Sequence, residues 1–486
     1  MSKFQSRTVQ KAMADSEHGA IHIVLLPYPT QGRINPILQF GKRLAARRGV
    51  RCTLTVTRAS RPHVAAISDG CDPGGFREAP DVDDYLSRLL RSEATQDRPV
   101  HALVYDSFLS WAPQRGGAPR RGERVCAVNV AYEHVFGGRI KLPLAHAGEE
   151  PVRLPGVSVS LRLDELPTLM VDTNGCPAYL DLAVNQFKDL DMADHVLVNS
   201  LYELQPQEAE HMVSAWWAKT VGPTVPSVYL DNCLPDDKSY GFHLFALVIE
   251  TKVWLDTRAA RSATYIPFGS VTTPTSQQMA KVCTTLTSRK LWVVKASKIS
   301  KTPEGFVCKV ASEDRGFIVT WCPQLEVLAH PAIGCFVMHC GWNSIMEGLS
   351  AGIPMVAVPQ WFDQPTNAKY IEDVWCVGVR VQPDDEGWVR KEELERCVRE
   401  VMEEERSEKY EKNAADWKET WRRRGKPRAM MFYRTNYSSF GYGGWLRAQR
   451  RRGSSRMARR GAEPWVKTCL MARERDDGKL LDMVRS

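Results

Sequence analysis

The stretch 321–364 contains the residues of this chain whose types and spacing best suit the binding of a phosphate group. Within it, 334–338 is a short apolar run that predicts a strand, 339–342 predicts a tight turn, and 343–351 predicts a helix that Gly352 ends. The helix would begin at the carboxyl end of the strand, where unpaired backbone N–H groups and the helix dipole favour an anion. The segment therefore predicts a phosphate site at the amino end of this helix.

Side chains around the predicted helix suit the other parts of a nucleotide sugar. An indole offers a flat face for an aromatic base, a contact worth about 1–3 kcal/mol. A carboxylate one turn into the helix can accept hydrogen bonds from a ribose diol, and an adjacent acid and amide can bind several hexose hydroxyls. The indole is that of Trp321 and the carboxylate is that of Glu347. The adjacent acid and amide are Asp363 and Gln364. Asn343 and Ser344 supply polar groups at the helix start.

The histidines and cysteines of the same stretch do not indicate a metal site. His330, Cys335, His339 and Cys340 lack the paired Cys-x-x-Cys or His-x-x-x-His spacing that is typical of zinc ligands. Each of them alone fits an ordinary loop or core position. We therefore predict that this segment binds no metal.

The 44 residues of 321–364 resemble the signature box of plant secondary-product glycosyltransferases, and similar residues at 27–44, 104–111 and 268–271 extend the resemblance across both halves of the chain. Members of that family move sugar from UDP-sugars to small acceptors. The resemblance implies an α/β protein with the GT-B fold, in which two Rossmann-like domains present parallel sheets to a central cleft. It also implies a hexosyltransferase of secondary metabolism that uses UDP-glucose as co-substrate, without a metal or another cofactor.

The resemblance further implies roles for individual donor-binding residues. Trp321 would stack on uracil, the backbone of Cys322 would bond the base edge, and Glu347 would hold the ribose. A Gln at the end of the box commonly accompanies glucose in this family, so UDP-glucose is the expected donor. The residues expected to contact the diphosphate are Ser270, His339, Asn343 and Ser344. Those expected to contact the sugar are Trp342, Asp363 and Gln364. The predicted donor-binding set also includes Gln324 and Gly341.

The resemblance also implies two catalytic groups, a histidine base in the first strand-to-helix loop and an aspartate that orients it, with inversion as UDP is displaced. Asp106, which follows the apolar run 102–105, matches the aspartate. At the position of the histidine the sequence has Arg33. Arginine keeps its proton, with a pKa above about 12, so Arg33 cannot act as a base. Loss of base catalysis typically lowers a rate by about 10²–10⁴-fold.

Arg33 leaves three interpretations open. The chain could transfer glucose to hydroxyl acceptors at a strongly reduced rate. It could instead use carboxylate acceptors, which are already ionised and could pair with Arg33 to give glucose esters. It could also be a catalytically impaired protein that binds UDP-sugars. A further hypothesis, of another class, is a binder of nucleic acid or of a membrane surface that uses the basic tail.

An alternation of strands and helices must position these residues. A buried strand at 21–26, a helix with apolar residues from 34 to 45 and a strand at 52–56 form a strand-helix-strand unit, whose first loop lies where such sheets bind ligands. Later apolar runs repeat the pattern and predict parallel sheets. These runs are 102–105, 195–198, 263–266, 291–294 and 355–358.

The length of 486 residues predicts two domains. The expected order is an N-terminal acceptor-binding Rossmann-like domain, a linker, a C-terminal UDP-sugar-binding Rossmann-like domain and a basic, disordered tail. Their predicted limits are 17–235, 236–255, 256–420 and 421–486. Loops of the N-terminal half would form the acceptor pocket, so the sequence leaves the acceptor open among secondary metabolites and hormones.

The charge and the cysteine content exclude several classes of protein. The tail from Trp421 has 18 Lys and Arg against 5 Asp and Glu, so the net charge of +8 comes from the tail and the remainder is mildly acidic. The 13 cysteines have no disulfide-type spacing, and the first 20 residues carry no export signal. We therefore expect a cytoplasmic monomer that binds a UDP-sugar and a small acceptor, with no nucleic acid and no integral membrane contact.

Overall fold

The computed structural model of the chain contains two compact units. Among the residues described, unit 1 contains those up to Gly122 and those from Lys188 to Leu197, and unit 2 contains those from 126 to Phe187 and from Val198 onward. The described residues are 21–28, 30–55, 90–96, 98–109, 120–122, 126–144, 150–190, 193, 195–241, 250–267, 289–293, 316–385, 387 and 389–424.

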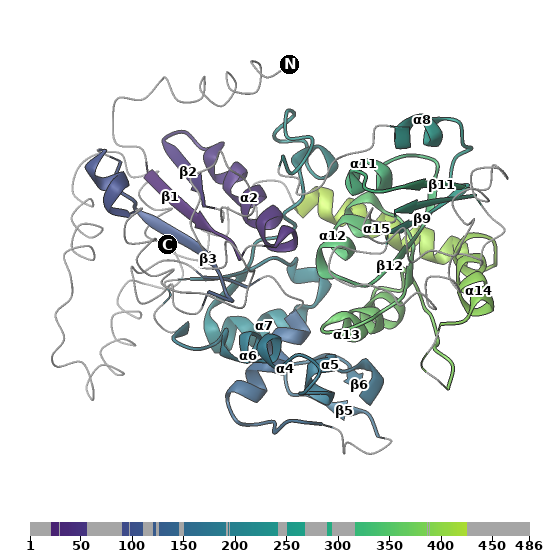
Figure 1. The fold of residues 1–486 in the computed structure, drawn as a ribbon, viewed down its shortest axis with the longest axis horizontal. Helices are drawn as coiled ribbons and strands as arrows, with labels where there is room; N and C mark the ends of the chain where they lie inside the picture. The colour runs from purple at the N-terminus through teal and green to yellow at the C-terminus, as the bar shows by residue number, and fades with distance from the viewer. Residues whose placement is uncertain are drawn as a thin grey trace. The chain divides into compact units, whose positions relative to one another are not determined.

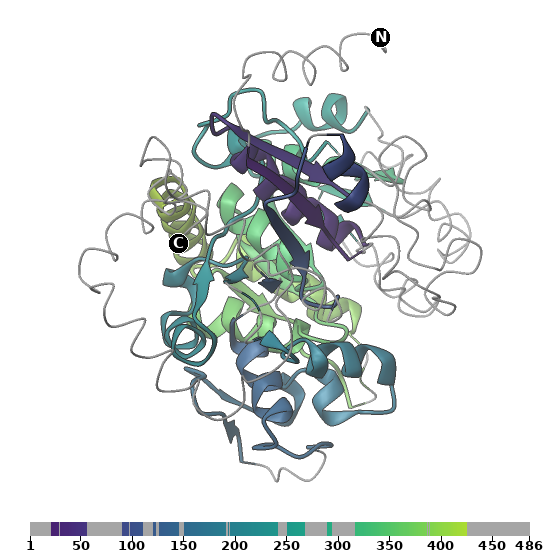
Figure 2. The same cartoon turned by 90° about the vertical axis from the view of Figure 1, so that its left-hand side faces the viewer.

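Unit 1 is built on parallel strands, with one helix after the first strand (purple in Figure 2). The strands are β1 (Ile21–Leu26), β2 (Val50–Leu54), β3 (Ala102–Asp106) and β4 (Arg120–Gly122), and the helix is α2 (Gln31–Ala45). Their order in the sheet is β2, β1, β3, β4, and Leu25 of β1 aligns with Leu54 of β2 and with Val104 of β3. The loops that leave β1 and β3 therefore emerge side by side at one edge of the sheet.

Tight packing fixes the position of α2 on this sheet. A Cβ atom at Gly41 would lie 2.1 Å from Cδ1 of Leu25, so the helix backbone approaches β1 closely there. A larger residue at this position would force either the Leu25 side chain or the helix to move. Side chains alternate along β1, so Val24 and Leu26 lie on the opposite face of the sheet from Leu25, in an apolar cluster with Leu103 and Tyr105 of β3.

The C-terminal part of unit 2 contains a second parallel sheet (Figure 1). Its strands are β9 (Ala263–Pro267), β10 (Arg289–Val293), β11 (Gly316–Val319), β12 (Ile333–Met338), β13 (Met355–Ala357) and β14 (Gly378–Arg380). The order is β11, β10, β9, β12, β13, β14, which counted along the chain is the Rossmann-like order 3-2-1-4-5-6. Ligands of such sheets bind at the carboxyl ends of the strands where the winding reverses, which is here between β9 and β12.

Helices cover the second sheet. They are α8 (Glu250–Asp256), α11 (Gln324–Leu328), α12 (Trp342–Ala351), α13 (Gln364–Lys369), α14 (Lys391–Met402) and α15 (Ser407–Arg424), and a π-helical turn spans Tyr370–Val374. Helix α14 packs on β12, β13 and β14, and α12 contacts α11 and α15. The apolar core between α14 and the sheet includes Ile266, Val337, Val356, Val379, Leu394, Val398 and Val401.

Helix α15 corrects one detail of the sequence analysis. Residues 421–424, which we assigned to the basic tail, continue this helix, and Trp421 is fully buried. The indole anchors the last turn in the core, so these residues form a packed element and not a tail. Residues 425–486 lie outside the described part of the chain.

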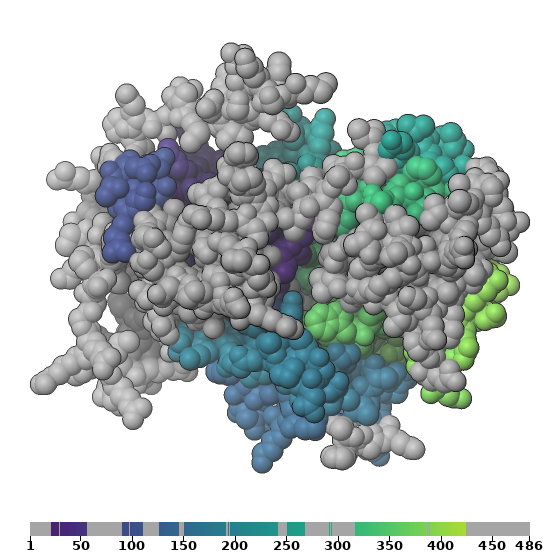
Figure 3. Space-filling view, in the orientation of Figure 1, coloured from purple at the N-terminus to yellow at the C-terminus, as the bar shows by residue number. Residues whose placement is uncertain are grey.

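The N-terminal part of unit 2 consists of short elements around two helices, α4 (Cys126–Phe136) and α7 (Pro206–Trp216), which pack on each other. Figure 3 shows the surface around α6 and α7 in blue and teal. A fully buried carboxylate, Glu208 on α7, accepts hydrogen bonds from the hydroxyls of Ser158 and Tyr370. The other elements are β5 (Val152–Arg153), β6 (Ser160–Leu161), α5 (Thr168–Val171), α6 (Pro177–Asn185), β8 (Ala218–Thr220), and β7 (Val196–Val198), within which the chain passes into unit 2.

Several predictions from the sequence can be compared with these elements. An α/β class with parallel sheets is confirmed, and β1 has the predicted bounds. The second strand begins at Val50, two residues before the predicted start, because the chain pairs with β1 from Ile21 onward. Apart from the start of the tail, the predicted domain limits remain predictions. Among the described helices, none has the length and apolar character needed to traverse a bilayer. The cysteines of the described residues are free thiols.

Candidate functional site

The amino end of α12 lies where the sheet of unit 2 reverses its winding. Strand β12 ends at Met338, a turn follows, and α12 begins at Trp342 after Gly341. The helix has 10 residues, and the N–H groups of its first turn have no acceptor within the helix, so this end favours an anion. At the other end Gly352 adopts a left-handed conformation with a φ of 73°, which ends the helix as predicted.

A hydrogen-bond network between α11 and α12 holds Glu347, the residue predicted to bind ribose. Nε2 of Gln324 donates to Oε2 of Glu347 at 2.6 Å and to Oγ of Ser344 at 3.1 Å. The hydroxyl of Tyr240 donates to the other carboxylate oxygen at 2.9 Å. Ser344 and Glu347 are three positions apart, so they share one face of the helix and a single amide can reach both. The fold therefore brings Gln324, Ser344 and Glu347 together.

Burial changes the acid strength of Glu347. It raises the pKa of the carboxyl group to about 7, although the hydrogen bonds from Gln324 and Tyr240 act in the opposite direction. The group therefore gains or loses its proton near neutral pH. Only the ionised form can accept hydrogen bonds from both hydroxyls of a ribose diol without donating one itself. Binding of a ribose at this position would thus be coupled to the protonation state of Glu347.

Tyr265 of β9 contacts Gln324, the residue that donates to Ser344 and Glu347. Its hydroxyl donates to Oε1 of Gln324 at 3.4 Å and lies 3.4 Å from Sγ of Cys322. Its ring stacks on Phe336 of β12 with centroids 5.4 Å apart. Burial raises the pKa of the Tyr265 phenol well above its ordinary value, and it raises the pKa of the Cys322 thiol to about 12. Both side chains are therefore neutral, and Gln324 is held in one orientation.

The turn before α12 places His339 against Gly341. A Cβ atom at position 341 would lie 2.4 Å from Nε2 of His339, so glycine is the residue that fits while the imidazole keeps its place. Burial lowers the pKa of His339 to about 4, so the ring is neutral at physiological pH. Its Nδ1 atom is buried and has no hydrogen-bond partner. A buried polar atom in this state is unfavourable until a partner satisfies it, and a phosphate oxygen could accept an N–H from this ring.

Asn367 connects this turn to the predicted sugar-binding pair. Its Nδ2 donates to the backbone oxygen of Cys340 at 2.8 Å and to Oδ2 of Asp363 at 3.0 Å. The side-chain oxygen of Gln364 accepts hydrogen bonds from two backbone N–H groups of the preceding turn, at 2.8 and 3.2 Å. The NH₂ group of Gln364 is therefore the part of the amide that can meet a hexose hydroxyl.

The indole of Trp342 makes structural contacts inside unit 2. The side chain is buried, and its Nε1–H donates to the backbone oxygen of Asn199 at 2.6 Å. Its ring lies beside Trp375, with centroids 6.2 Å apart. Since the indole is committed to these contacts, a sugar contact by Trp342 would have to come from its backbone N–H at the start of α12.

Three predicted donor-binding residues remain. Trp321 lies in the loop between β11 and α11 and is partly buried. Asn343 is the second residue of α12 and is also partly buried. Ser270 lies outside the described residues.

In unit 1 the fold brings Arg33 and Asp106 together. Nη1 of Arg33 lies 3.2 Å from Oδ2 and 3.5 Å from Oδ1 of Asp106, which is fully buried at the end of β3. The backbone N–H of Phe108 donates to Oδ1 at 2.9 Å. Cζ of Arg33 also lies 4.2 Å from the ring centroid of Phe108. An ion pair and a cation–π contact therefore fix the guanidinium group.

This ion pair affects the hypothesis of a carboxylate acceptor. The positive charge of Arg33 already has an anionic partner in Asp106. An acceptor carboxylate would therefore have to use N–H groups of Arg33 other than the one that contacts Asp106. The charge available to attract it is correspondingly reduced.

Sequence reasoning missed two residues of the site. Tyr240, which donates to Glu347, falls within the predicted linker 236–255, and no local pattern distinguishes it from a solvated tyrosine. Asn367 stands four positions after Asp363, and this helical spacing was a signal that could have revealed it.

Sequence comparison finds relatives that span most of the chain. A family model described as UDP-glucoronosyl and UDP-glucosyl transferase matches residues 247–420. The chain is 43% identical to the UDP-glucosyltransferase UGT13248 of Hordeum vulgare subsp. vulgare, over 82% of this chain and 90% of that protein. It is 44% identical to crocetin glucosyltransferase 2 of Crocus sativus, over 82% of this chain and 91% of that protein.

Structure comparison gives the same result. The crystal structure of Os79 from O. sativa in complex with UDP has a TM-score of 0.75 and 39% sequence identity, covering 82% of this chain and 95% of that chain. Another structure of Os79, in complex with U2F and trichothecene, has a TM-score of 0.73 and 39% identity with the same coverage. The predicted GT-B fold class is thereby confirmed.

Proposed function

This chain belongs to the UDP-glucosyl transferase family and is a UDP-glycosyltransferase, and from that premise we propose that it transfers glucose from UDP-glucose to a small-molecule acceptor with inversion. The observation that carries the proposal is the network in which Gln324 of α11 donates to Ser344 and Glu347 of α12. These residues offer a carboxylate suited to ribose close to a helix end that favours phosphate.

We propose that the donor lies across the start of α12. Uracil would stack on Trp321 and the ribose would donate to Glu347. The diphosphate would accept hydrogen bonds from the first turn of α12 and from His339, whose buried Nδ1 has no partner in the described structure. The hexose would meet the NH₂ group of Gln364 and the carboxylate of Asp363.

The reaction places a developing charge on this helix end. An acceptor oxygen attacks C1 of glucose, and the bond between C1 and the β-phosphate oxygen breaks as UDP leaves. The first turn of α12 stabilises the negative charge that grows on the leaving diphosphate. The acceptor proton cannot go to Arg33, so solvent or another basic group has to take it unless the acceptor is already ionised.

Relatives support a secondary metabolite as the acceptor. They include proteins named for crocetin and for the 7-O position of flavonols. The comparisons give no support to the alternative of a catalytically impaired protein, since these relatives are named as glucosyltransferases. The alternative of a nucleic-acid or membrane-surface binder depends on the basic tail 421–486, of which only 421–424 are among the described residues. A monomeric state and a cytoplasmic location remain predictions.

Trp321→Ala tests the proposed position of the base. Loss of stacking is expected to raise the Kd for UDP by about 5- to 150-fold, because a base on an aromatic ring contributes about 1–3 kcal/mol. Isothermal titration calorimetry with UDP measures this directly. Trp217→Ala, which removes an indole that is 59% exposed and outside the site, is the matched control and should leave the Kd unchanged. Equal affinity of the Trp321→Ala variant and the parent would show that the base binds elsewhere.

A further inference from the structure

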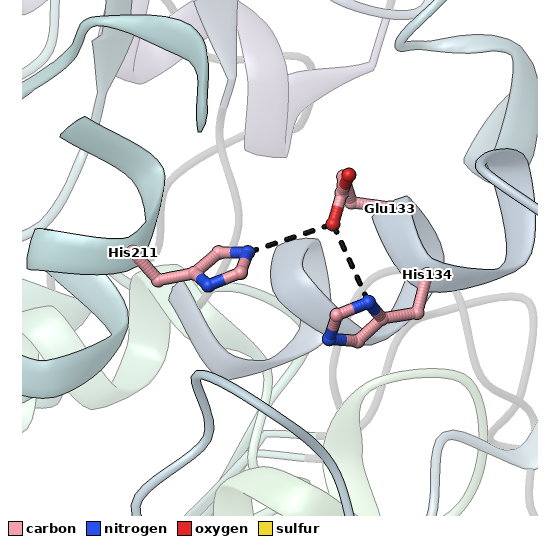
Figure 4. Close-up of side chains that lie close together, drawn as sticks. All are labelled: Glu133, His134 and His211. Atoms are coloured by element: carbon pink, nitrogen blue, oxygen red, sulfur yellow. Dashed lines mark ion pairs between the residues drawn. The ribbon is translucent and has the colours of Figure 1, made fainter. Parts of the chain in front are cut away.

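Two histidines and a glutamate that take no part in the proposed donor site meet between α4 and α7 (Figure 4). Oε2 of Glu133 lies 3.6 Å from Nδ1 of His134 and 3.5 Å from Nε2 of His211. Oε2 of Glu133 and Nε2 of His211 are both buried, and neither has a hydrogen-bond partner. Unsatisfied buried atoms of this kind are unfavourable, and here two of them point at the same place.

The distances suit a tetrahedral metal ion. Ligands about 2.0–2.1 Å from a tetrahedral zinc ion lie about 3.3–3.4 Å from one another, close to the two distances from Oε2 of Glu133. The carboxylate oxygen and the two ring nitrogens all lie within 4.8 Å of one another. A small rotation of the rings would therefore bring the two nitrogens to the separation that zinc requires. Two imidazoles and one carboxylate form a ligand set that binds Zn²⁺ and leaves a fourth position for water.

The surroundings orient both imidazoles as ligands. Nε2 of His134 lies 2.6 Å from the backbone oxygen of Pro155, which can only accept, so this nitrogen carries the proton and Nδ1 keeps its lone pair. Such a hydrogen bond to a carbonyl is typical of histidines that bind metals. His211 packs on Gly156, where a Cβ atom would lie 2.3 Å from Nδ1, so the glycine leaves room for the ring in this position.

A positive group already occupies part of this cluster. Nε of Arg139 donates to Nδ1 of His134 at 2.7 Å, and Nη2 pairs with Oε1 of Glu133. The cluster therefore attracts a cation, and the guanidinium satisfies it only in part, since His211 has no share in this pairing. The Arg139 side chain is 52% exposed, so it can swing into solvent when a smaller and more highly charged cation arrives.

We propose that Glu133, His134 and His211 form a Zn²⁺ site that links α4 to α7, with Arg139 as the group that occupies the site in the absence of metal. The ion would be bound by side chains from two helices that are far apart in the sequence, so it would act as a structural cross-link. This role is separate from glycosyl transfer, which uses other residues. Mg²⁺ is not expected to compete, because it prefers oxygen ligands.

Zinc titration of the full chain tests the proposal. A chromogenic chelator in competition is expected to report one tight Zn²⁺ site, and thermal unfolding is expected to shift upward with ZnCl₂ but not with MgCl₂. Glu133→Gln and His211→Ala should each raise the Kd for Zn²⁺ by about tenfold or more. Arg139→Ala should lower it by about tenfold, because one charge-assisted hydrogen bond no longer has to be broken.

His330→Ala is the matched control, since His330 contacts Asp256 and lies outside the cluster. Its affinity for Zn²⁺ should equal that of the parent. The proposal is overturned if Glu133→Gln and His211→Ala bind Zn²⁺ as tightly as the parent, because the metal would then be held by other residues. It is equally overturned if the folded Arg139→Ala variant shows no gain in affinity. The opposite directions expected for Arg139→Ala and His211→Ala separate metal binding from a general loss of stability.

Discussion

Arg33→His is expected to raise the rate of glucosyl transfer to phenols and alcohols by about 10²–10⁴-fold. The position is already prepared for a base, since Asp106 is buried at the end of β3 and its Oδ1 is fixed by the backbone N–H of Phe108. Its Oδ2 lies 3.2 Å from the Arg33 side chain, so it faces the residue that would be replaced. A histidine there could donate one ring N–H to Asp106 and accept the acceptor proton on its other nitrogen.

Turnover with UDP-glucose and a panel of phenols measures this effect, with UDP affinity as a check that the donor site is intact. Arg33→Lys is the matched control, because it keeps the positive charge beside Asp106 and should give no gain on phenols. Adding Asp106→Asn to Arg33→His should remove most of the gain, since the ring would lose the group that orients it. If Arg33→His binds UDP normally and remains as slow as the parent, the position is not the one that limits the reaction.

The hypothesis of carboxylate acceptors has its own readout in the same series. If acids pair with Arg33, both Arg33→His and Arg33→Lys should lower the rate of ester formation. The decrease should be larger for Arg33→His, because histidine lacks both the fork of N–H donors and the permanent charge, whereas lysine keeps the charge. Unchanged rates on aromatic acids in both variants would exclude that pairing.

Glu347→Gln is expected to stabilise the donor-free protein by up to about 3 kcal/mol at about pH 8 and to weaken UDP binding. The pKa of the carboxyl group rises from 4.5 to about 7 on folding, and each pKa unit corresponds to about 1.36 kcal/mol. The folded chain thus binds this proton more tightly than the unfolded chain. The resulting stability is present below about pH 4.5 and is lost as the pH rises through about 7. Glutamine cannot ionise, so the variant avoids this loss.

Urea unfolding of the parent and the Glu347→Gln variant at about pH 5 and about pH 8 measures the difference. The gap between the two proteins should be small at the lower pH and large at the higher pH. UDP affinity should change in the opposite sense, rising with pH through about 7 in the parent and staying low and flat in the variant, because the ionised carboxylate is the form that accepts from the ribose diol. Parallel stability curves would mean that Glu347 is not the group that titrates.

Local sequence determined the elements and the donor segment. The apolar runs of β1 and β12 and the stop at Gly352 are short-range patterns, because the side-chain periods of strands and helices are set by the backbone itself. The residue type alone also determined that Arg33 cannot act as a base, since arginine stays protonated at physiological pH.

Tertiary structure alone decided which groups meet. Glu347 and Tyr240 are 107 positions apart, and Asp106 and Arg33 are 73 apart, so no local period links them. Burial then set the pKa of Glu347, and packing turned the indole of Trp342 into the interior. The same holds for the cluster of Glu133, His134 and His211, which exists only because α4 packs on α7. Contacts between distant residues depend on how the helices and strands pack on one another. A single sequence indicates where each helix or strand forms, through its local side-chain pattern, but it does not show which elements pack together.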